Sequence, residues 1–169
     1  MTALPVIRAP RSEREAILAV VRAAFDQDDE ARLVERLWDE NAIRRELVAE
    51  LDGAVAGYCA FSEVVAEPPM NGLLLGLAPV AALPEQQGRE VGTRLVRIGL
   101  ALAKAEGASL VVVLGEPRYY ARFGFEPASR YNIHWAAKDA GDAFQLIDFA
   151  GAADGLPHAI HYHPAFSEV

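Results

Sequence analysis

The feature that most constrains this chain is a short glycine-containing turn, Gln87–Gly92, which lies between a run of apolar residues and a predicted helix. The apolar run, residues 73–83, predicts a buried strand that is interrupted at Pro79, and apolar residues recur at helical spacing over residues 91–102. A glycine-containing turn that opens a helix presents free backbone N–H groups and the positive end of the helix dipole. The turn therefore predicts an anion site, most naturally for phosphate, although its glycines would also suit a simple tight turn.

Two common phosphate-binding loops do not fit this turn. A Walker loop needs Lys followed by Ser or Thr after its last glycine, whereas Gly92 is followed by Thr93 and Arg94. The dinucleotide fingerprint G-x-G-x-x-G is absent, and the chain carries no second βαβ half. The pattern that remains, with Gln87 first and Gly92 last, resembles the Q/R-x-x-G-x-G/A signature of the GNAT N-acetyltransferases. In that family the turn binds the diphosphate of coenzyme A.

Glu90 departs from this signature, because the family usually has glycine at that position. A glutamate keeps its backbone N–H as a donor if the local φ is negative. Its carboxylate would repel a nearby diphosphate by about 1 kcal/mol for a solvated pair, and Arg89 and Arg94 would offset that repulsion. We expect weakened rather than lost binding of the cofactor.

A second segment, Tyr119–Phe125, resembles the Y-x-x-x-G-F/Y sequence that joins the last helix of the GNAT family to the strand after it. The preceding residues 110–114 predict a short buried strand. Both patterns occur in the family's order along the chain, and the resemblance extends over nearly the whole sequence. It is closest to a branch that carries Y-Y-x-R-F-G-F and a closing Y-H-P-A-F, here Tyr162–Phe166.

The resemblance implies an α/β fold of the GNAT-like acyl-CoA N-acyltransferase type, with a mixed central sheet that is splayed at its fourth and fifth strands and flanked by helices. It implies a single N-acetyltransferase domain over residues 1–169. The implied activity is transfer of an acetyl group from acetyl-CoA, the cosubstrate, to an amine of a small molecule or a protein, by direct attack in a ternary complex. The alternative is a non-catalytic acyl-CoA-binding regulatory domain; Glu90 favours it and Tyr120 favours the enzyme.

The resemblance places the cofactor on two segments of the chain. The backbone of the predicted fourth strand would pair with the pantetheine arm, and an N–H near Ala81 or Ala82 would be the oxyanion donor. Pro79 has no N–H and would help to splay this strand from the next one. The residues assigned to cofactor binding are Val80, Ala81, Ala82, Gln87, Gly88, Arg89, Glu90, Val91, Gly92 and Thr93.

Tyr120 matches the position of the family's usual general acid. A phenol with a pKa of about 10 is protonated at neutral pH and can give its proton to a thiolate whose conjugate acid has a pKa of about 8.5. The alternative is a half-buried helix aromatic that bonds to water or backbone. For the base that deprotonates the incoming ammonium, Glu63, Glu116 and a chain of water molecules stay open as alternatives.

The amino-acid composition limits the classes of partner that this protein is expected to bind. The net charge of −8 argues against nucleic acid and mildly favours a cationic acceptor. One cysteine, Cys59, excludes an internal disulfide, and its apolar neighbours favour a packed strand position. No signal peptide or membrane-spanning run is apparent, so we expect a cytoplasmic protein without membrane contact, and a homodimer stays open.

The rest of the chain predicts further elements. Ser12 and Glu15 form a capping-box pattern at the start of a first helix, and Asp52-Gly53 predicts a tight hairpin turn. His161 and His163 share a strand face, but without a third ligand at matching spacing they predict no metal site. The other expected elements are strands at 4–8, 47–51, 54–61, 144–149 and 159–163, a helix at 30–38, a loop at 66–72 and a helix that ends near Glu106.

Overall fold

The computed structural model describes residues 3–86 and 88–168 and divides the chain into two compact units. The first unit contains residues 1–61, 79–101 and 164–169, and the second contains residues 62–78 and 102–163. Strands β3 and β5 and helix α3 each contribute residues to both units.

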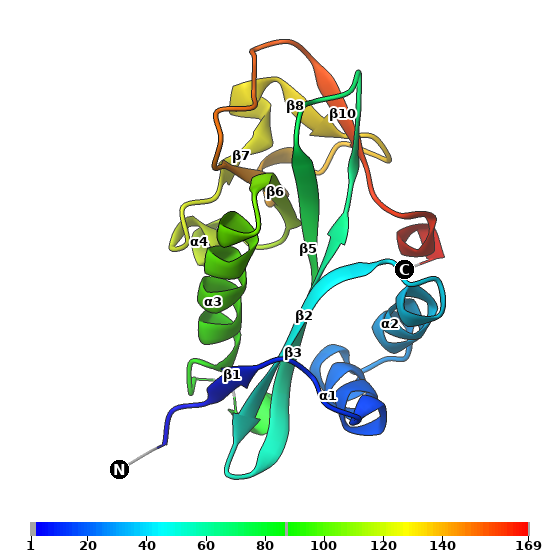
Figure 1. Ribbon diagram of the computed structural model, residues 1–169, viewed down its shortest axis with the longest axis vertical. Helices are drawn as coiled ribbons and strands as arrows, with labels where there is room; N and C mark the ends of the chain where they lie inside the picture. The colour runs from blue at the N-terminus through cyan, green and yellow to red at the C-terminus, as the bar shows by residue number, and fades with distance from the viewer. Residues whose placement is uncertain (1–2, 87, 169) are drawn as a thin grey trace. The chain divides into compact units, whose positions relative to one another are not determined.

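In the first unit, helices cover both faces of a sheet whose strand order is β1-β2-β3-β5 (Figure 1). Helices α1 and α2 pack on one face, in a cluster that includes Val21, Val34, Val48 and Tyr58. The start of α3 packs on the opposite face. The elements are β1 (Val6–Arg8), α1 (Arg14–Phe25), α2 (Asp29–Asp39), β2 (Ile43–Leu51), β3 (Ala54–Glu63), the end of β5 (Leu73–Ala82), η1 (Pro84–Gln86), the start of α3 (Val91–Ala105) and η4 (Pro164–Glu168).

The predicted hairpin between β2 and β3 is confirmed. Asp52 and Gly53 both have positive φ, 54° and 81°, as a two-residue type I′ turn requires. β2 begins at Ile43, earlier than the sequence pattern indicated, and its first four residues are partly buried or exposed, whereas Leu47, Val48 and Ala49 are buried.

The predicted capping box at the start of α1 is wrong. Helix α1 begins at Arg14, and its N-cap residue, Glu13, makes no capping hydrogen bond with its side chain. The Glu13 carboxylate instead accepts from the Arg8 guanidinium at 2.6 and 3.0 Å and from the Arg11 N–H at 2.9 Å. These donors lower the pKa of Glu13 to about 2, with the Arg8 hydrogen bonds as the largest cause. A charged donor on β1 therefore takes the carboxylate that could have capped the helix.

The second unit contains one sheet with the order β5-β6-β9-β7 and another with the order β4-β10-β8. Leu110, Val112, Phe144, Leu146 and Ile160 belong to its buried core. The elements are β4 (Val65–Glu67), the start of β5, the end of α3, β6 (Ala108–Leu114), α4 (Pro117–Ala121), β7 (Glu126–Pro127), η2 (Ala128–Tyr131), β8 (Ile133–Trp135), η3 (Gly141–Ala143), β9 (Phe144–Asp148) and β10 (His158–His161).

The pairing of β5 with β6 shows where the sheet opens. The two strands pair in parallel from Leu73 and Ala108 to Gly76 and Val112. β6 continues to Leu114 beside β9, which runs antiparallel to it. The strands therefore stop pairing before β6 ends, and the mixed, splayed sheet expected from the sequence is confirmed.

Three sequence expectations need correction in detail. Pro79 does not interrupt its strand, because β5 runs continuously from Leu73 to Ala82. Ala66 and Glu67 belong to strand β4, which pairs with β10, rather than to a loop. His163 lies beyond the end of β10, so it does not share a strand face with His161.

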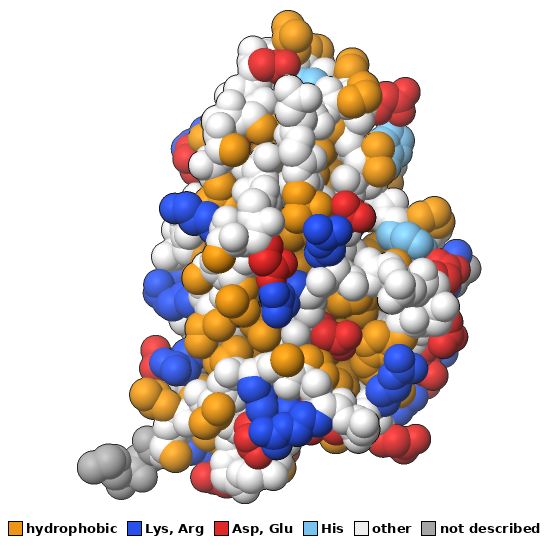
Figure 2. Space-filling view, in the orientation of Figure 1, with side chains coloured by type: hydrophobic (Ala, Val, Ile, Leu, Met, Phe, Trp, Pro, Cys, Tyr) orange, Lys and Arg blue, Asp and Glu red, His pale blue; other side chains and the backbone are white. Residues whose placement is uncertain are grey.

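Acidic and basic side chains are interspersed on the face shown in Figure 2, without a continuous region of one charge. Among the residues that the structure describes, no helix is long and apolar enough to cross a bilayer.

Candidate active site

The predicted phosphate turn connects η1 to α3. The Arg89 N–H donates to the Gln86 carbonyl oxygen at 3.2 Å, which closes a tight turn before α3 begins at Val91. Gly88 has a φ of 87°, which favours glycine at this position. Gln87, the first residue of the signature, lies outside the described residues. The glycine-containing turn at a helix start is therefore present as the sequence predicted.

Glu90 adopts a left-handed backbone conformation, with a φ of 61°. We expected the Glu90 N–H to remain a donor if the φ of this residue were negative. The observed φ is positive, so that condition is not met. This conformation costs a residue with a Cβ roughly 1–2 kcal/mol, and glycine avoids the cost. The family's usual glycine at this position thus has a backbone reason, and Glu90 departs from it in conformation as well as in charge.

Gly57 on β3 allows the start of α3 to lie close to the sheet. A Cβ on Gly57 would lie 2.4 Å from Val91 Cγ1, 3.0 Å from Leu95 Cδ1 and 3.0 Å from the Ala81 carbonyl oxygen. The first turn of α3 and strand β5 therefore both approach this glycine. A side chain at position 57 would push the helix start outward.

Arg89 and Arg94 contact the N-terminal segment of the chain. Arg89 donates to the Gln86 side chain at 2.9 Å and to the Ala3 carbonyl oxygen at 3.2 Å. Arg94 Nε donates to the Pro5 carbonyl oxygen at 3.3 Å. Both guanidinium groups are thus partly engaged beside the turn, which limits how far they can offset the Glu90 charge.

The backbone of β5 distinguishes the two candidate oxyanion donors. The Leu83 N–H donates to the Ala56 carbonyl oxygen at 2.9 Å, and the Ala81 carbonyl oxygen also faces β3, as its approach to Gly57 shows. Backbone groups point to alternate sides along a strand, so the Ala82 N–H points away from β3. Ala82 rather than Ala81 therefore presents its donor toward the open side of β5.

Tyr120 lies on the short helix α4, whose start is well defined. Pro117 occupies the first turn, and the Glu116 side chain accepts from the Arg118 N–H at 3.3 Å as the N-cap. The Tyr120 ring packs edge-on against Phe125, with centroids 5.7 Å apart, and it lies against the backbone of Gly115. Glu116, one of the candidate bases, thus has a capping role, while Glu63 is exposed at the end of β3.

Tyr162, from the closing motif, is partly buried in the second unit. A Cβ on Gly76 would lie 2.7 Å from its ring, and Trp135 packs edge-on against it with centroids 6.4 Å apart. Burial, and secondarily the electrostatic interaction with Tyr120, raise the pKa of Tyr162 above its ordinary value. Tyr162 therefore stays protonated at physiological pH.

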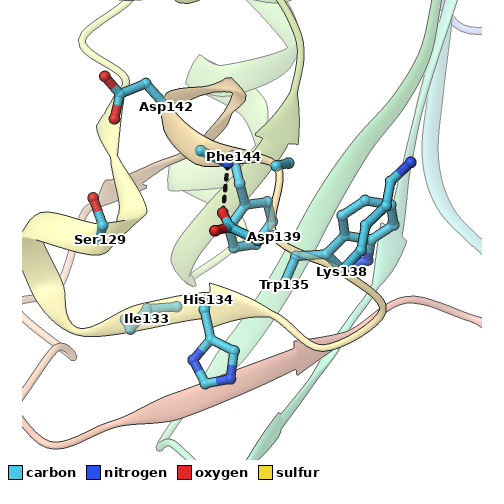
Figure 3. Close-up of a pocket in the computed structure, with 10 residues that line it drawn as sticks. Ser129, Ile133, His134, Trp135, Lys138, Asp139, Asp142 and Phe144 are labelled. Atoms are coloured by element: carbon cyan, nitrogen blue, oxygen red, sulfur yellow. Dashed lines mark hydrogen bonds between the residues drawn. The ribbon is translucent and has the colours of Figure 1, made fainter.

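A cavity of about 380 Å³ lies within the second unit (Figure 3). Lys138 Nζ lies 5.6 Å from the Trp135 ring centroid, and Asp139 accepts from the Gly141 N–H at 2.8 Å. Of the residues predicted to bind the cofactor, none that the structure describes lines this cavity, and neither does Tyr120. Its lining residues are Ser129, Ile133, His134, Trp135, Lys138, Asp139, Ala140, Gly141, Asp142 and Phe144.

His158 has two hydrogen-bond partners. His158 contacts the Pro68 carbonyl oxygen at 2.7 Å and Asp154 at 3.0 Å, and these contacts raise its pKa. Over residues 3–86 and 88–168, no group of three or more His, Cys, Asp or Glu side chains is arranged to bind a metal ion. Cys59 is fully buried, and burial raises its pKa to about 12, which is consistent with the packed position predicted for it.

Sequence reasoning missed Glu46, a part-buried carboxylate on β2. It accepts hydrogen bonds from Trp38 and Tyr58, which come from α2 and β3. The signal available in the sequence was a glutamate directly before the buried run 47–49, with no motif around it. The contacts that distinguish it from a solvated glutamate are between residues distant in the chain.

The chain is similar to known proteins over most of its length. The family model described as an acetyltransferase (GNAT) domain matches residues 5–128. YhbS of Escherichia coli K12, named as an uncharacterised N-acetyltransferase, is 34% identical over 151 residues, which cover 88% of this chain and 90% of that protein. The crystal structure of YhbS from Escherichia coli in complex with CoA has a TM-score of 0.89 and 33% identity, covering 99% of this chain and 94% of that one. A GNAT family acetyltransferase from Brucella melitensis in complex with acetyl-CoA has a TM-score of 0.79 and 34% identity, covering 96% and 97%.

Proposed function

Because this chain belongs to the GNAT family of acetyltransferases, we propose that it transfers the acetyl group of acetyl-CoA to the amino group of an acceptor within a ternary complex. The observation that carries the proposal is the turn before α3, in a chain whose relatives from Escherichia coli and Brucella melitensis have structures with CoA and acetyl-CoA. One N-acetyltransferase domain over residues 1–169 is part of the same proposal.

The first turn of α3 would bind the diphosphate. The first N–H groups of a helix have no partner within the helix, and they carry the positive end of its dipole. Val91 and Gly92 place such groups at the start of α3, Gly88 and Arg89 form the turn that leads into it, and Gly57 allows that end to approach the sheet. These residues fit a diphosphate, with Glu90 as the unfavourable member of the set.

The end of β5 would bind the pantetheine arm and the acyl group. The arm would pair with the backbone of Val80, Ala81 and Ala82, as an added strand does. The Ala82 N–H would donate to the oxygen of the thioester carbonyl as negative charge develops there. Its direction away from β3 supports this assignment over Ala81.

Tyr120 would act as the general acid. The acceptor first loses its ammonium proton to the base, for which Glu63, Glu116 and water stay open, and its nitrogen then bonds to the carbonyl carbon. The carbon–sulfur bond breaks, the departing thiolate takes the phenolic proton, and the second proton lost by the nitrogen restores the phenol. The fixed start of α4 and the packing against Phe125 support a defined position for the ring.

The cationic acceptor, the homodimer and the cytoplasmic location stay predictions from the sequence.

Two measurements test the proposal. Acetyl-CoA should raise the melting temperature by mass action, by an amount equivalent to about 2.7 kcal/mol at 100 times its Kd. Thiol release from acetyl-CoA should then depend on an added amine, and Tyr120→Phe should slow a single turnover by about 10²–10⁴-fold without loss of acetyl-CoA affinity. Binding without turnover on any amine would favour the regulatory alternative, and no melting shift would refute the proposal.

A further inference from the structure

One histidine ring joins two loops of the second unit to β10. His158 is the first residue of β10, and only 3% of its surface is exposed. Its Nδ1 lies 2.7 Å from the Pro68 carbonyl oxygen, in the loop between β4 and β5. Its Nε2 lies 3.0 Å from Asp154 Oδ1, in the loop between β9 and β10. The ring therefore connects two segments that are far apart in the sequence.

Both partners of this ring can only accept hydrogen bonds. A carbonyl oxygen has no proton to donate. Hydrogen bonds from the Leu156 N–H and then from His158 lower the pKa of Asp154, so its carboxylate is ionised at neutral pH. A neutral imidazole has one N–H and would turn a lone pair toward one of the two oxygens, whereas an imidazolium donates from both nitrogens. The two contacts therefore require the protonated ring, and they raise its pKa, with the Pro68 hydrogen bond as the largest cause.

The other charged groups beside β10 do not contact this ring. Among the residues that the structure describes, Asp154 is the charged group that pairs with it. Glu67 of β4 pairs instead with His161, and His134 of β8 is exposed at the rim of the cavity. On its inner side the ring shares a face of β10 with Ile160, which is fully buried. Because a buried charge is stable only while it is paired, a change in protonation must change the contacts.

Loss of the proton would break the contact with Asp154 first. The contact with Pro68 is the shorter one, so the remaining N–H would stay on Nδ1. Nε2 would then turn a lone pair toward the Asp154 carboxylate, and the two acceptors would repel. Residues 154–157 would keep one side-chain attachment, because Asn132 Nδ2 donates to the Gly155 carbonyl oxygen at 3.2 Å. The change would therefore fall on this short segment.

We propose that His158 is a proton-dependent clamp, in which the imidazolium holds residues 154–157 to β10 and loss of its proton releases them while the ring stays bonded to Pro68. The folded-state pKa of His158 lies above the ordinary value of 6.5. The stability that the clamp contributes is therefore fully present below pH 6.5 and is lost as the pH rises through the folded-state pKa. This inference does not depend on the proposed acetyl transfer.

An NMR titration of the full chain, with ¹⁵N-labelled histidine, tests the clamp. Most His158 rings should have both nitrogens protonated at pH 6.5, and Nε2 should lose its proton at a higher pH. Relaxation of the Cα atoms of Gly155 and Leu156 would report release of the segment. Their order parameters should fall from about 0.85 to below about 0.6 over the same pH range. A ring with one N–H at pH 6.5, or order parameters that do not follow its titration, would overturn the inference.

Two variants separate the clamp from a general effect of pH. His158→Gln retains a side-chain N–H for Pro68 but does not titrate, so residues 154–157 should be mobile at every pH. His161→Gln is the matched control, because His161 lies on the same strand and pairs with Glu67 at 3.2 Å, and it should leave the pH-dependent release unchanged. Release that still depends on pH in His158→Gln, or that disappears in His161→Gln, would contradict the clamp.

A third variant applies if His158→Gln does not fold. The side chain of Asp154→Asn still offers an oxygen to His158 Nε2 and to the Leu156 N–H, but it carries no charge. The pKa of His158 should therefore be lower in this variant than in the unaltered protein. An unchanged pKa would show that the Asp154 charge does not hold the imidazolium, and the inference would then be wrong.

Discussion

The ring of Tyr120 lies against the backbone of Gly115, at the end of β6. A Cβ on Gly115 would lie 2.3 Å from Tyr120 Cε2 and 2.9 Å from Cδ2, distances that real atoms do not tolerate. Tyr119 and Phe125 pack edge-on against the other sides of the ring, with centroids 5.0 and 5.7 Å away. The position of the proposed general acid therefore depends on a residue without a side chain.

Gly115→Ala should impair acetyl transfer by displacing the Tyr120 ring. A misplacement of about 1 Å can cost about 10²-fold in rate, so we expect a loss of this order in a single turnover with saturating acetyl-CoA. Affinity for acetyl-CoA should change little, because the proposed diphosphate contacts come from the turn before α3, to which Gly115 does not belong.

Tyr120→Phe provides the comparison for this variant. If Gly115→Ala acts through the phenol, combining the two substitutions should cost no more than Tyr120→Phe alone. If the fold-losses in single-turnover rate of the two single variants instead multiply in the double variant, then Gly115→Ala acts through a group other than the Tyr120 phenol.

Gly57→Ala should weaken acetyl-CoA binding and lower stability. The added methyl group would meet Val91 and Leu95 at the start of α3, and relief of such crowding typically costs about 1–3 kcal/mol of unfolding free energy. The shift would fall on the helix end that we propose for the diphosphate. Urea unfolding and a calorimetric Kd would measure the two effects.

Gly99→Ala is the matched control for Gly57→Ala. Gly99 lies on α3 itself, about two turns beyond the helix start at Val91. Its methyl group would lie 2.6 Å from Phe61 Cε2, so it should also destabilise the fold. Because Gly99 is remote from the helix start, acetyl-CoA affinity should be nearly unchanged. A similar loss of affinity in both variants would mean that general destabilisation, rather than the helix start, sets binding.

The elements that local sequence determines were predictable. The Asp52-Gly53 hairpin and the end of α3 near Glu106 follow from turn residues and short-range periodicity, and the helix that carries Tyr120 followed from the family resemblance. These features depend on φ preferences and side-chain spacing within a few residues. The candidate cofactor turn belongs to the same class, since its glycines and the following helix are adjacent in the chain.

Long-range contacts account for what the sequence could not indicate. Glu13 resembled an ordinary helix-start residue until β1 placed Arg8 beside it, and Glu46 had no motif to mark its two donors. Glu90 was recognised as a departure in residue type, but its left-handed φ is a property of the folded turn. The choice of Ala82 over Ala81 required the register between β3 and β5.

The ion pair between Glu13 and Arg8 should make stability depend on pH. The pKa of Glu13 is lowered from 4.5 to about 2, so the folded state favours the ionised carboxylate. A lowered pKa contributes stability above pH 4.5, and that contribution is lost as the pH falls from 4.5 toward 2. We expect Glu13→Gln to lower the free energy of unfolding at pH 7 and to approach the unaltered protein near pH 2.

Urea unfolding at several pH values would measure this difference. Arg8→Gln should remove most of the effect, so that adding Glu13→Gln in that background changes little. A constant difference between pH 2 and pH 7 would contradict a role for the Glu13 charge.

Glu90→Gly should both stabilise the protein and tighten acetyl-CoA binding. Glycine relieves the left-handed backbone at φ 61°, and after its greater freedom in the unfolded chain we expect a gain of about 0.5–1 kcal/mol. Removing the carboxylate also removes a like charge from the proposed diphosphate site, worth about 1 kcal/mol in a solvated setting.

Asp26→Gly is the control, because Asp26 has a φ of 52° at the end of α1. It should raise stability in urea without changing the Kd for acetyl-CoA. Weaker acetyl-CoA binding in Glu90→Gly would show that the glutamate itself supports the cofactor turn.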